Sequence, residues 1–130
     1  MRALPNMKVL NPATYTEAVE VIKYLCNTDL DSPYYLRLGR QPIEDVFESD
    51  YKFEFGKGVE VVGGDDITII STGCVLPDVL DSAKVIEEQT GNSVRVINIH
   101  TLKPIDEEII IKAAKETDLI VTVEDHSIIG

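Results

Sequence analysis

The sequence lacks most of the features that mark membrane, secreted and metal-binding proteins. Its apolar runs are only a few residues long, whereas a membrane-spanning helix needs about 20 apolar residues. No apolar signal segment follows Met1 and Arg2. The two cysteines, Cys26 and Cys74, lie far apart and outside any metal or redox spacing. These absences predict a cytoplasmic protein with reduced thiols, no membrane partner and no metal site of its own.

Two motifs of enzyme sites are also missing. Residues Ser71–Gly73 precede a predicted helix, whose N-terminus can hold an anion, but no glycine-rich phosphate loop is present. No Gly-x-Ser-x-Gly elbow surrounds Ser71. We therefore predict no catalytic nucleophile at this turn.

Positive charge is scarce. The 12 lysines and arginines stand against 23 aspartates and glutamates, which gives a formal net charge of −11 at pH 7. Such a surface repels the phosphates of nucleic acids and anionic lipids, so neither is an expected partner. Solubility is the simplest explanation of the acidity. Each cation is therefore worth considering as a residue placed for a purpose.

The first 38 residues have the pattern of one β-α-β unit. A short strand at Val9–Leu10 is followed by Thr14 and Glu17, which have the spacing of a capping box. The β-forming residues Tyr34–Leu38 predict a second strand, parallel to the first. One such unit cannot bury its own apolar surface and needs a sheet to join. The helix between the strands has one apolar stripe, formed by Tyr15, Ala18, Val19, Ile22 and Leu25.

Residues 39–63 are predicted to be a linker and a β-hairpin. The linker "GRQPIEDVFESDY" is polar and acidic. After it, apolar and polar residues alternate on both sides of Gly56–Gly58, which favours a hairpin with its turn at the glycines.

Residues 64–130 alternate strand, helix, strand, helix and strand, which predicts an open, mostly parallel α/β sheet with helices on both faces. Asp106 is the expected N-cap of the second helix. The last strand, Leu119–Val123, is followed by no further helix, although parallel strands need cover on both faces. The pattern therefore predicts an incomplete domain, with more chain expected before Met1 and after Gly130.

Five side chains are candidates for a functional site. Arg37 and Arg40 lie at and just past the end of a predicted strand, and the planar guanidinium can bind two phosphate oxygens at once. For Arg40 a phosphate role and a surface role are equally open, while Arg37 has the alternative of pairing with an acid. His100 follows a strand, where it is either a ligand or general base, or a turn residue bonded to backbone. Glu124 and His126 follow the last strand with Asp125 between them, and the three form either an acid–base cluster or an interface or surface turn.

Several longer segments resemble one enzyme family. They are "RALPNMKVLNPATYTEA", "PYYLRLGR", "FGKGVEVVGGDDITIISTG", "INIHTLKPIDEE" and "TVEDHSIIG". Together they resemble the C-terminal portion of transketolase, and in particular the separate C-terminal subunit of transketolases that are split into two chains. The resemblance covers nearly the whole chain. It implies that residues 1–38 end a thiamine pyrimidine-binding domain, that 39–63 connect, and that 64–130 are a truncated transketolase C-terminal domain.

The resemblance implies a function that this chain cannot perform alone. Complete enzymes of the family transfer ketol units between sugar phosphates in the pentose phosphate pathway, with thiamine diphosphate and a divalent metal such as magnesium. Arg40 matches an arginine of the family that binds the substrate phosphate. No residue here matches those that hold the cofactor or metal, so the expected partner is a thiamine-binding N-terminal chain or domain. The complete enzyme would be a homodimer or heterotetramer, with Arg37, His100, Glu124 and His126 at the interface or at the edge of the site.

Two alternatives remain open at the level of sequence. The chain could be a non-enzymatic remnant that only binds a partner. It could also belong to a deoxyxylulose-phosphate synthase or to a pyruvate dehydrogenase beta-type subunit, which share this layout. The acceptor sugar, and whether the truncation is natural, are not determined by the residues.

Overall fold

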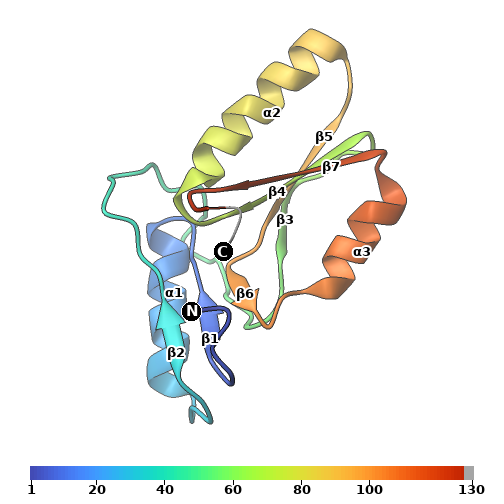
Figure 1. The fold of residues 1–130 in the computed structure, drawn as a ribbon. Helices are drawn as coiled ribbons and strands as arrows, with labels where there is room; N and C mark the ends of the chain where they lie inside the picture. Colours follow the sequence, from blue (N-terminus) through green and yellow to red (C-terminus); the bar gives the residue numbers. More distant parts are fainter. Residues whose placement is uncertain (128–130) are drawn as a thin grey trace.

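Two β-sheets meet in the computed structural model, which describes residues 1–127 (Figure 1). The first sheet has the order β2-β1-β6. Strands β1 (Lys8–Leu10) and β2 (Tyr34–Leu36) are parallel and are joined by helix α1 (Tyr15–Asn27). Strand β6 (Thr101–Lys103) pairs antiparallel with the other edge of β1. The predicted β-α-β unit is confirmed, and the sheet that it joins is extended by a strand from much later in the chain.

The second sheet has the order β3-β5-β4-β7. Strand β4 (Ile67–Thr72) lies at its centre and is parallel to both β5 (Val94–Asn98) and β7 (Leu119–Glu124). Strand β3 (Val59–Val62) pairs antiparallel with β5 at one edge. The predicted mostly parallel sheet is confirmed, with one antiparallel edge strand added.

Helices cover both faces of the four-stranded sheet, as predicted (Figure 1). Helix α2 (Leu76–Thr90) follows a short 3-10 turn, η1 (Gly73–Val75), and ends at Gly91, whose φ of 76° suits glycine. Helix α3 (Glu107–Glu116) begins at the predicted N-cap, where the Asp106 carboxylate accepts from the Ile109 amide. Local sequence signals therefore place both helix ends.

The core of the four-stranded sheet is divided by the sheet into two apolar layers. Alternate residues of a strand point to opposite faces, so Ile69 and Val96 pack beneath α2, while Ile70 and Ile97 pack beneath α3. Buried residues of the α2 layer are Ala13, Ile69, Leu76, Val79, Ala83, Val94 and Val96. Those of the α3 layer are Ile97, Ile99 and Ala113.

Two predictions about strands were wrong. The residues on the two sides of Gly56–Gly58 do not form a hairpin, because residues 51–58 contain no strand and β3 pairs with β5 instead. The segment after His100, predicted as a turn, forms β6. Both errors have one cause: a strand pairs with an edge that is open in space, and the open edges of β5 and β1 are not visible in local sequence.

The predicted apolar stripe of α1 was wrong at two of its five positions, while Ala18, Val19 and Leu25 are half-buried. Tyr15 is 74% exposed and Ile22 is exposed, whereas Glu17 and Val21 are completely buried. The buried face of α1 is thus centred on a carboxylate. The predicted capping box between Thr14 and Glu17 does not form. The Thr14 hydroxyl donates to Asp45 instead, and the Glu17 carboxylate accepts from the Ala13 amide.

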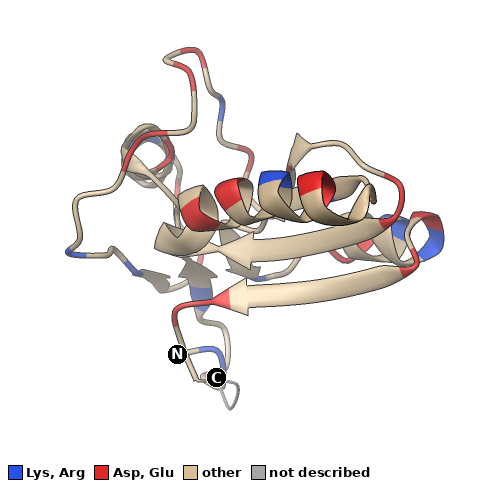
Figure 2. Cartoon of the chain, turned by 90° about the horizontal axis from the view of Figure 1, so that it is seen from above, with Lys and Arg blue, Asp and Glu red and all other residues tan. Residues whose placement is uncertain are grey.

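Strand β7 is an edge of the sheet within residues 1–127, and it pairs only with β4. Leu119 is 52% exposed and Val121 is 39% exposed, so apolar surface on this strand is uncovered, as predicted. Residues Ile128–Gly130, at the end of the predicted third segment, lie outside the described residues. Within residues 1–127 no helix is long and apolar enough to cross a membrane. Acidic residues outnumber basic ones in the chain, 23 to 12, and Figure 2 shows where both kinds lie on the ribbon.

Candidate functional site

A cavity of about 330 Å³ lies where strands of both sheets end. We call it the strand-end cavity. It is lined from the carboxyl ends of four strands, β1, β2, β4 and β7, which is the edge at which α/β sheets bind ligands. The residues that line it are Asn11, Arg37, Leu38, Gly39, Arg40, Gln41, Thr72, Cys74 and Asp125.

A close contact between the two sheets builds the floor of this cavity. Asn11, just after β1, donates its amide nitrogen to Thr72 Oγ1 at 3.1 Å, and its backbone amide donates to the His100 carbonyl at 2.8 Å. Gly73 has φ 71°, and a Cβ there would lie 2.5 Å from Asn11 Nδ2. Any larger residue would collide with the Asn11 amide group and strain the backbone at this positive φ. Gly73 therefore allows the two sheets to share one cavity.

Arg40 is the unpaired cation of the strand-end cavity. It is exposed and makes no hydrogen bond or ion pair with any residue in the part of the chain that the structure describes. A guanidinium retains its charge at all physiological pH values and offers five N–H donors. The predicted placement just past β2 is confirmed, and the side chain is available to an anion.

Arg37 also lines the strand-end cavity, and its predicted alternative, pairing with an acid, is observed. Its Nη2 atom donates to the Asp125 backbone carbonyl at 2.6 Å and lies 3.4 Å from Asp125 Oδ2. Its backbone amide donates to the Leu10 carbonyl at 2.8 Å. Arg37 therefore connects the end of β2 to the turn after β7.

A smaller cavity of about 120 Å³ lies on the other side of Arg37. Glu124 and His126 line it together with Arg37, and both side chains are exposed. His126 Nδ1 lies 3.4 Å from the Ser127 carbonyl, and no hydrogen bond joins His126 to Glu124 within residues 1–127. The structure therefore brings Arg37, Glu124 and His126 together, but it does not form the acid–base pair that was one alternative for the last two.

His100 is fully buried and lines neither of these cavities. Its Nδ1 lies 2.9 Å from Thr101 Oγ1, and its ring packs 4.6 Å from that of Phe53. Its Nε2 has no partner within residues 1–127. Burial lowers the pKa of His100 to about 4, and nearby Asp106 offsets this only in part. The ring is therefore neutral at pH 7 and has the environment of a structural histidine.

A buried carboxylate connects α1 to the four-stranded sheet. Glu17 accepts from the Ala13 amide at 2.6 Å, from the Tyr51 hydroxyl at 2.7 Å and from Asn98 Nδ2 at 2.8 Å. Burial raises the pKa of Glu17, and the three donors offset part of that effect. This network joins α1, the connecting segment and β5.

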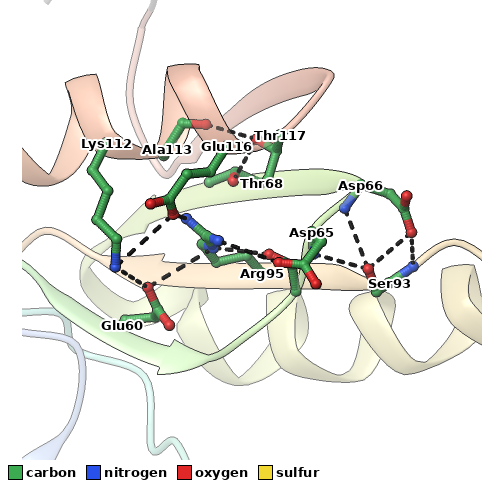
Figure 3. Close-up of polar contacts among 11 residues, drawn as sticks. Glu60, Asp65, Asp66, Thr68, Ser93, Arg95, Lys112, Ala113, Glu116 and Thr117 are labelled. Atoms are coloured by element: carbon green, nitrogen blue, oxygen red, sulfur yellow. Dashed lines mark hydrogen bonds and ion pairs between the residues drawn. The ribbon is translucent and has the colours of Figure 1, made fainter.

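A third arginine, Arg95, has a different environment at the amino end of β5 (Figure 3). It is 5% exposed. Its Nη1 lies 2.6 Å from Glu116 Oε2, its Nε donates to the Gly64 carbonyl at 2.9 Å, and Glu60 and Asp65 each lie 3.8 Å away. Its donors are directed to protein acceptors, which makes Arg95 a clamp between β3, the next turn and α3.

Some cavity residues were missed at the level of sequence. Asn11 and Cys74 line the strand-end cavity but were not candidates, whereas Thr72 and Asp125 were considered only as parts of a helix-start turn and of an acid–base cluster. Each lies at or within two residues of the end of a strand. The position of strand ends was the signal that could have identified them, because the carboxyl ends of parallel strands meet at one edge.

The arrangement is suited to binding an anion. Two arginines and one carboxylate line the strand-end cavity, in a chain whose net charge is −11. Hydroxyl and amide groups of Thr72 and Asn11 supply neutral hydrogen-bonding partners beside them. Cys74 Sγ, which also lines the cavity, donates to Asp125 Oδ2 at 3.9 Å. The two guanidinium groups and their neutral neighbours equip the cavity to hold and orient an anion.

Comparison with known proteins gives consistent relatives. A protein of Methanocaldococcus jannaschii named as a putative transketolase C-terminal section is 42% identical over 132 residues, which are 100% of this chain and 40% of that protein. One subunit of the apulose-4-phosphate transketolase of Phocaeicola vulgatus is 35% identical over 100% of this chain and 41% of its own length. The chain thus spans about two fifths of these curated relatives. A 1-deoxy-D-xylulose-5-phosphate synthase of Caldanaerobacter subterraneus is 31% identical over 21% of its length.

The fold has a close match among solved structures. A split-gene transketolase, described as an inactive beta4 tetramer, superposes with a TM-score of 0.93 at 38% identity, over 100% of this chain and 42% of that one. The family model for the transketolase C-terminal domain matches residues 56–130, which is more than half of the chain. With its mostly parallel sheet, its helices on both faces and these relatives, the chain belongs to the transketolase C-terminal domain family, and it is similar over its whole length to part of a split-gene transketolase.

Proposed function

We propose that this chain supplies the substrate-phosphate site to a complete transketolase, which transfers ketol units between sugar phosphates. The observation that carries the proposal is Arg40, an arginine without a protein partner among residues 1–127, in a cavity at the ends of four strands. A cavity of about 330 Å³ is within the range of small-ligand sites, which starts at roughly 300 Å³. The name of the Phocaeicola relative includes a sugar phosphate, which supports this ligand class.

The cofactor would be held elsewhere in the assembly. Enzymes of this family use thiamine diphosphate and a divalent metal, and the cofactor supplies a nucleophilic carbon for ketol transfer. Among residues 1–127 no group of three or more His, Cys, Asp or Glu side chains could hold a metal ion. The described residues therefore do not fit a metal–diphosphate site. This chain would bind and orient the phosphate end of the sugar and contribute to the assembly interface.

The partner would be a thiamine-binding N-terminal chain or domain, in a homodimer or heterotetramer. This follows from the share of the relatives that the chain covers, about two fifths. Within the chain we propose three parts: residues 1–38 as the end of a pyrimidine-binding domain, 39–63 as a connector, and 64–130 as part of the C-terminal domain. The isolated 130-residue chain is expected to have no transketolase activity.

The test is reconstitution of the complete assembly with thiamine diphosphate and magnesium. Ketol transfer to ribose 5-phosphate supports the proposal, whereas activity on pyruvate alone would assign the chain to the pyruvate dehydrogenase or deoxyxylulose-phosphate class. Arg40→Ala is expected to raise the KM for phosphorylated substrates roughly 10- to 100-fold, because one charge-assisted contact is lost. Lys84→Ala, which removes an exposed cation on α2, is the matched control. An unchanged KM in Arg40→Ala would defeat the assignment of Arg40.

One alternative keeps support from a specific observation. The deoxyxylulose-phosphate synthase match covers the whole chain at 31% identity, so the same strand-end cavity could serve that related reaction. The choice of donor, pyruvate or a ketose phosphate, separates the two in the assay above. A purely structural chain would show neither activity after reconstitution, and its Arg40→Ala variant would behave as wild type.

A further inference from the structure

The guanidinium of Arg37 is only partly engaged by the protein. Its Nη2 atom contacts the Asp125 carbonyl at 2.6 Å and the Asp125 carboxylate at 3.4 Å. An arginine has five N–H donors, and the other donors of Arg37 have no partner among residues 1–127. One edge of the guanidinium is therefore anchored on the turn after β7. The donors of the other edge have no protein partner among residues 1–127, and Arg37 lines the strand-end cavity.

The charges around the strand-end cavity suit a dianion. Arg37 and Arg40 are its cations, and Asp125 is the one carboxylate among its lining residues within the described part of the chain. A phosphate monoester carries about −1.5 to −2 charges near neutral pH, so a single arginine leaves roughly half of that charge unmatched. The chain as a whole, at −11, adds repulsion. A second cation at the same cavity supplies the missing charge.

The Asp125 carboxylate is a weak counter-ion for Arg37. Its distance of 3.4 Å is longer than the roughly 2.7–2.9 Å of a good charge-assisted hydrogen bond. The side chain of Asp125 is 66% exposed, so water can replace the arginine around it. The backbone carbonyl at 2.6 Å makes the shorter contact. An incoming phosphate can thus replace the carboxylate while the main-chain contact keeps the guanidinium in place.

We propose that Arg37 is a second phosphate-binding residue of the strand-end cavity, and that the Asp125 carboxylate is an internal competitor that phosphate displaces. This inference rests on the proposed function, because it extends the Arg40 site by one cation. It gives the cavity a preference among anions. A dianionic phosphate group gains contacts with both arginines, whereas a singly charged carboxylate ligand has less charge with which to displace Asp125.

The test is equilibrium binding of inorganic phosphate to the native protein in its complete assembly, by titration calorimetry at a pH where phosphate is a dianion. Arg37→Gln is expected to weaken binding about five- to twentyfold, since a charge-assisted contact is lost. Asp125→Asn is expected to tighten binding about two- to fivefold, since it removes a like charge and keeps the backbone carbonyl. Lys84→Gln and Asp81→Asn remove the same charges from an exposed pair on α2 and serve as controls.

Asp125→Asn keeps the test decisive if Arg37→Gln does not assemble, because it leaves Arg37 in place and has an expected direction of change in phosphate affinity. Arg37→Lys retains the charge and should keep phosphate affinity within about threefold of wild type, because the point charge still faces the ligand. A phosphate affinity of Arg37→Gln equal to that of Lys84→Gln would overturn the inference. Weaker binding in Asp125→Asn would also overturn it, because Asp125 would then help the site instead of competing.

The inference and the proposed function can fail separately. If Arg40→Ala weakens phosphate binding and Arg37→Gln does not, the Arg40 site stands and the second cation is wrong. If both variants weaken phosphate binding but the wild-type assembly transfers no ketol unit, the two-arginine site stands and the transketolase assignment is wrong.

Discussion

The amino end of β5 and the strand-end cavity each carry an arginine, and the two side chains have opposite surroundings. Arg95, at the amino end of β5, is 5% exposed and lies among three carboxylates and a backbone carbonyl. Arg40, at the carboxyl ends of the strands, is exposed and has no partner within residues 1–127. A guanidinium whose donors are all directed to protein acceptors has little left for a ligand. In this acidic chain the position of a cation relative to carboxylates separates a structural arginine, Arg95, from one whose donors are available, Arg40.

The two histidines repeat the contrast. His100 is completely buried, packs against Phe53 and has its pKa lowered to about 4. His126 is exposed beside Arg37 and Glu124 in the smaller cavity. Both follow a strand in the sequence, so their positions along the chain look alike. The difference arises because His100 lies between β5 and β6 and packs against Phe53, whereas the residues directly after β7 are exposed.

The largest expected effect comes from breaking the Arg95 clamp. Arg95→Ala should lower the free energy of unfolding by about 2–4 kcal/mol, because Glu60, Asp65 and Glu116 lose their shared cation and a buried side chain is removed. Urea denaturation of the native protein measures this. Phosphate binding of the folded variant should stay at the wild-type value. A variant as stable as wild type would mean that Arg95 is no clamp.

A change of pH tests the histidine contrast. The pKa of His100 is lowered from 6.5 to about 4, so between these values the unfolded chain binds a proton that the folded chain does not. The stabilising effect of the neutral ring is complete above pH 6.5 and is lost as pH falls toward 4. The loss amounts to about 3 kcal/mol at most. Melting curves over this range should show a shallower dependence for His100→Gln.

The matched control for this pH series is His126→Asn, which removes the exposed histidine and leaves His100 in place. Glu17 acts in the opposite direction. Burial raises its pKa above the ordinary value of 4.5, so its contribution to stability is lost as pH rises from 4.5 through the pKa of the folded protein. The share of His100 is therefore the difference between wild type and His100→Gln at each pH. Equal slopes in those two proteins would contradict a buried neutral ring.

A smaller change in free energy, but one specific to binding, is expected at Arg40. Arg40→Ala should lower phosphate affinity about 10- to 100-fold, which is roughly 1.4–2.7 kcal/mol. Its free energy of unfolding should change by no more than about 0.5 kcal/mol, because an exposed side chain without a protein partner among residues 1–127 is removed. Calorimetry and urea denaturation of the same sample give both values. A loss of stability with unchanged phosphate affinity would reverse the roles assigned to Arg40 and Arg95.

The smallest effect is expected at the rim of the Arg95 cluster. Lys112 Nζ lies 3.7 Å from Glu60 and 3.9 Å from Glu116, and its side chain is 56% exposed. Lys112→Ala should therefore cost less than about 0.5 kcal/mol, and the difference should vanish at high salt. Denaturation at two ionic strengths measures it. A cost comparable to that of Arg95→Ala would show that the cluster acts as one unit.

Sequence patterns predicted those features that depend on neighbouring residues. Strand β4 is rich in β-branched residues, and α2 stops at Gly91 because glycine accepts a φ of 76°. The N-cap at Asp106 needs only the Ile109 amide, three residues away. Arg40 was a candidate because it follows a strand, and the structure places it in a cavity. These features were predictable because their partners are close in the chain.

Other predictions failed where the partner is distant. The buried face of α1 could not be recognised, because Glu17 is stabilised by Asn98, which lies 81 residues away. The hairpin at Gly56–Gly58 was expected from alternation alone, yet β3 pairs with β5. Asp125 was missed as the partner of Arg37, from which it is separated by 88 residues. In each case the local pattern was compatible with two structures, and a remote segment selected one.

The sequence by itself determined the class of the fold, the ends of the two later helices, the scarcity of positive charge and the candidacy of Arg40. Hydrophobic periodicity and capping act within a few residues, so they can be read from the chain directly. Tertiary structure alone decided which arginine is buried, which histidine is neutral and which residues share the strand-end cavity. The cavity exists because strands from two sheets end at one place, with Gly73 small enough to let Asn11 approach Thr72. Packing in space sets that proximity, and no local pattern encodes it.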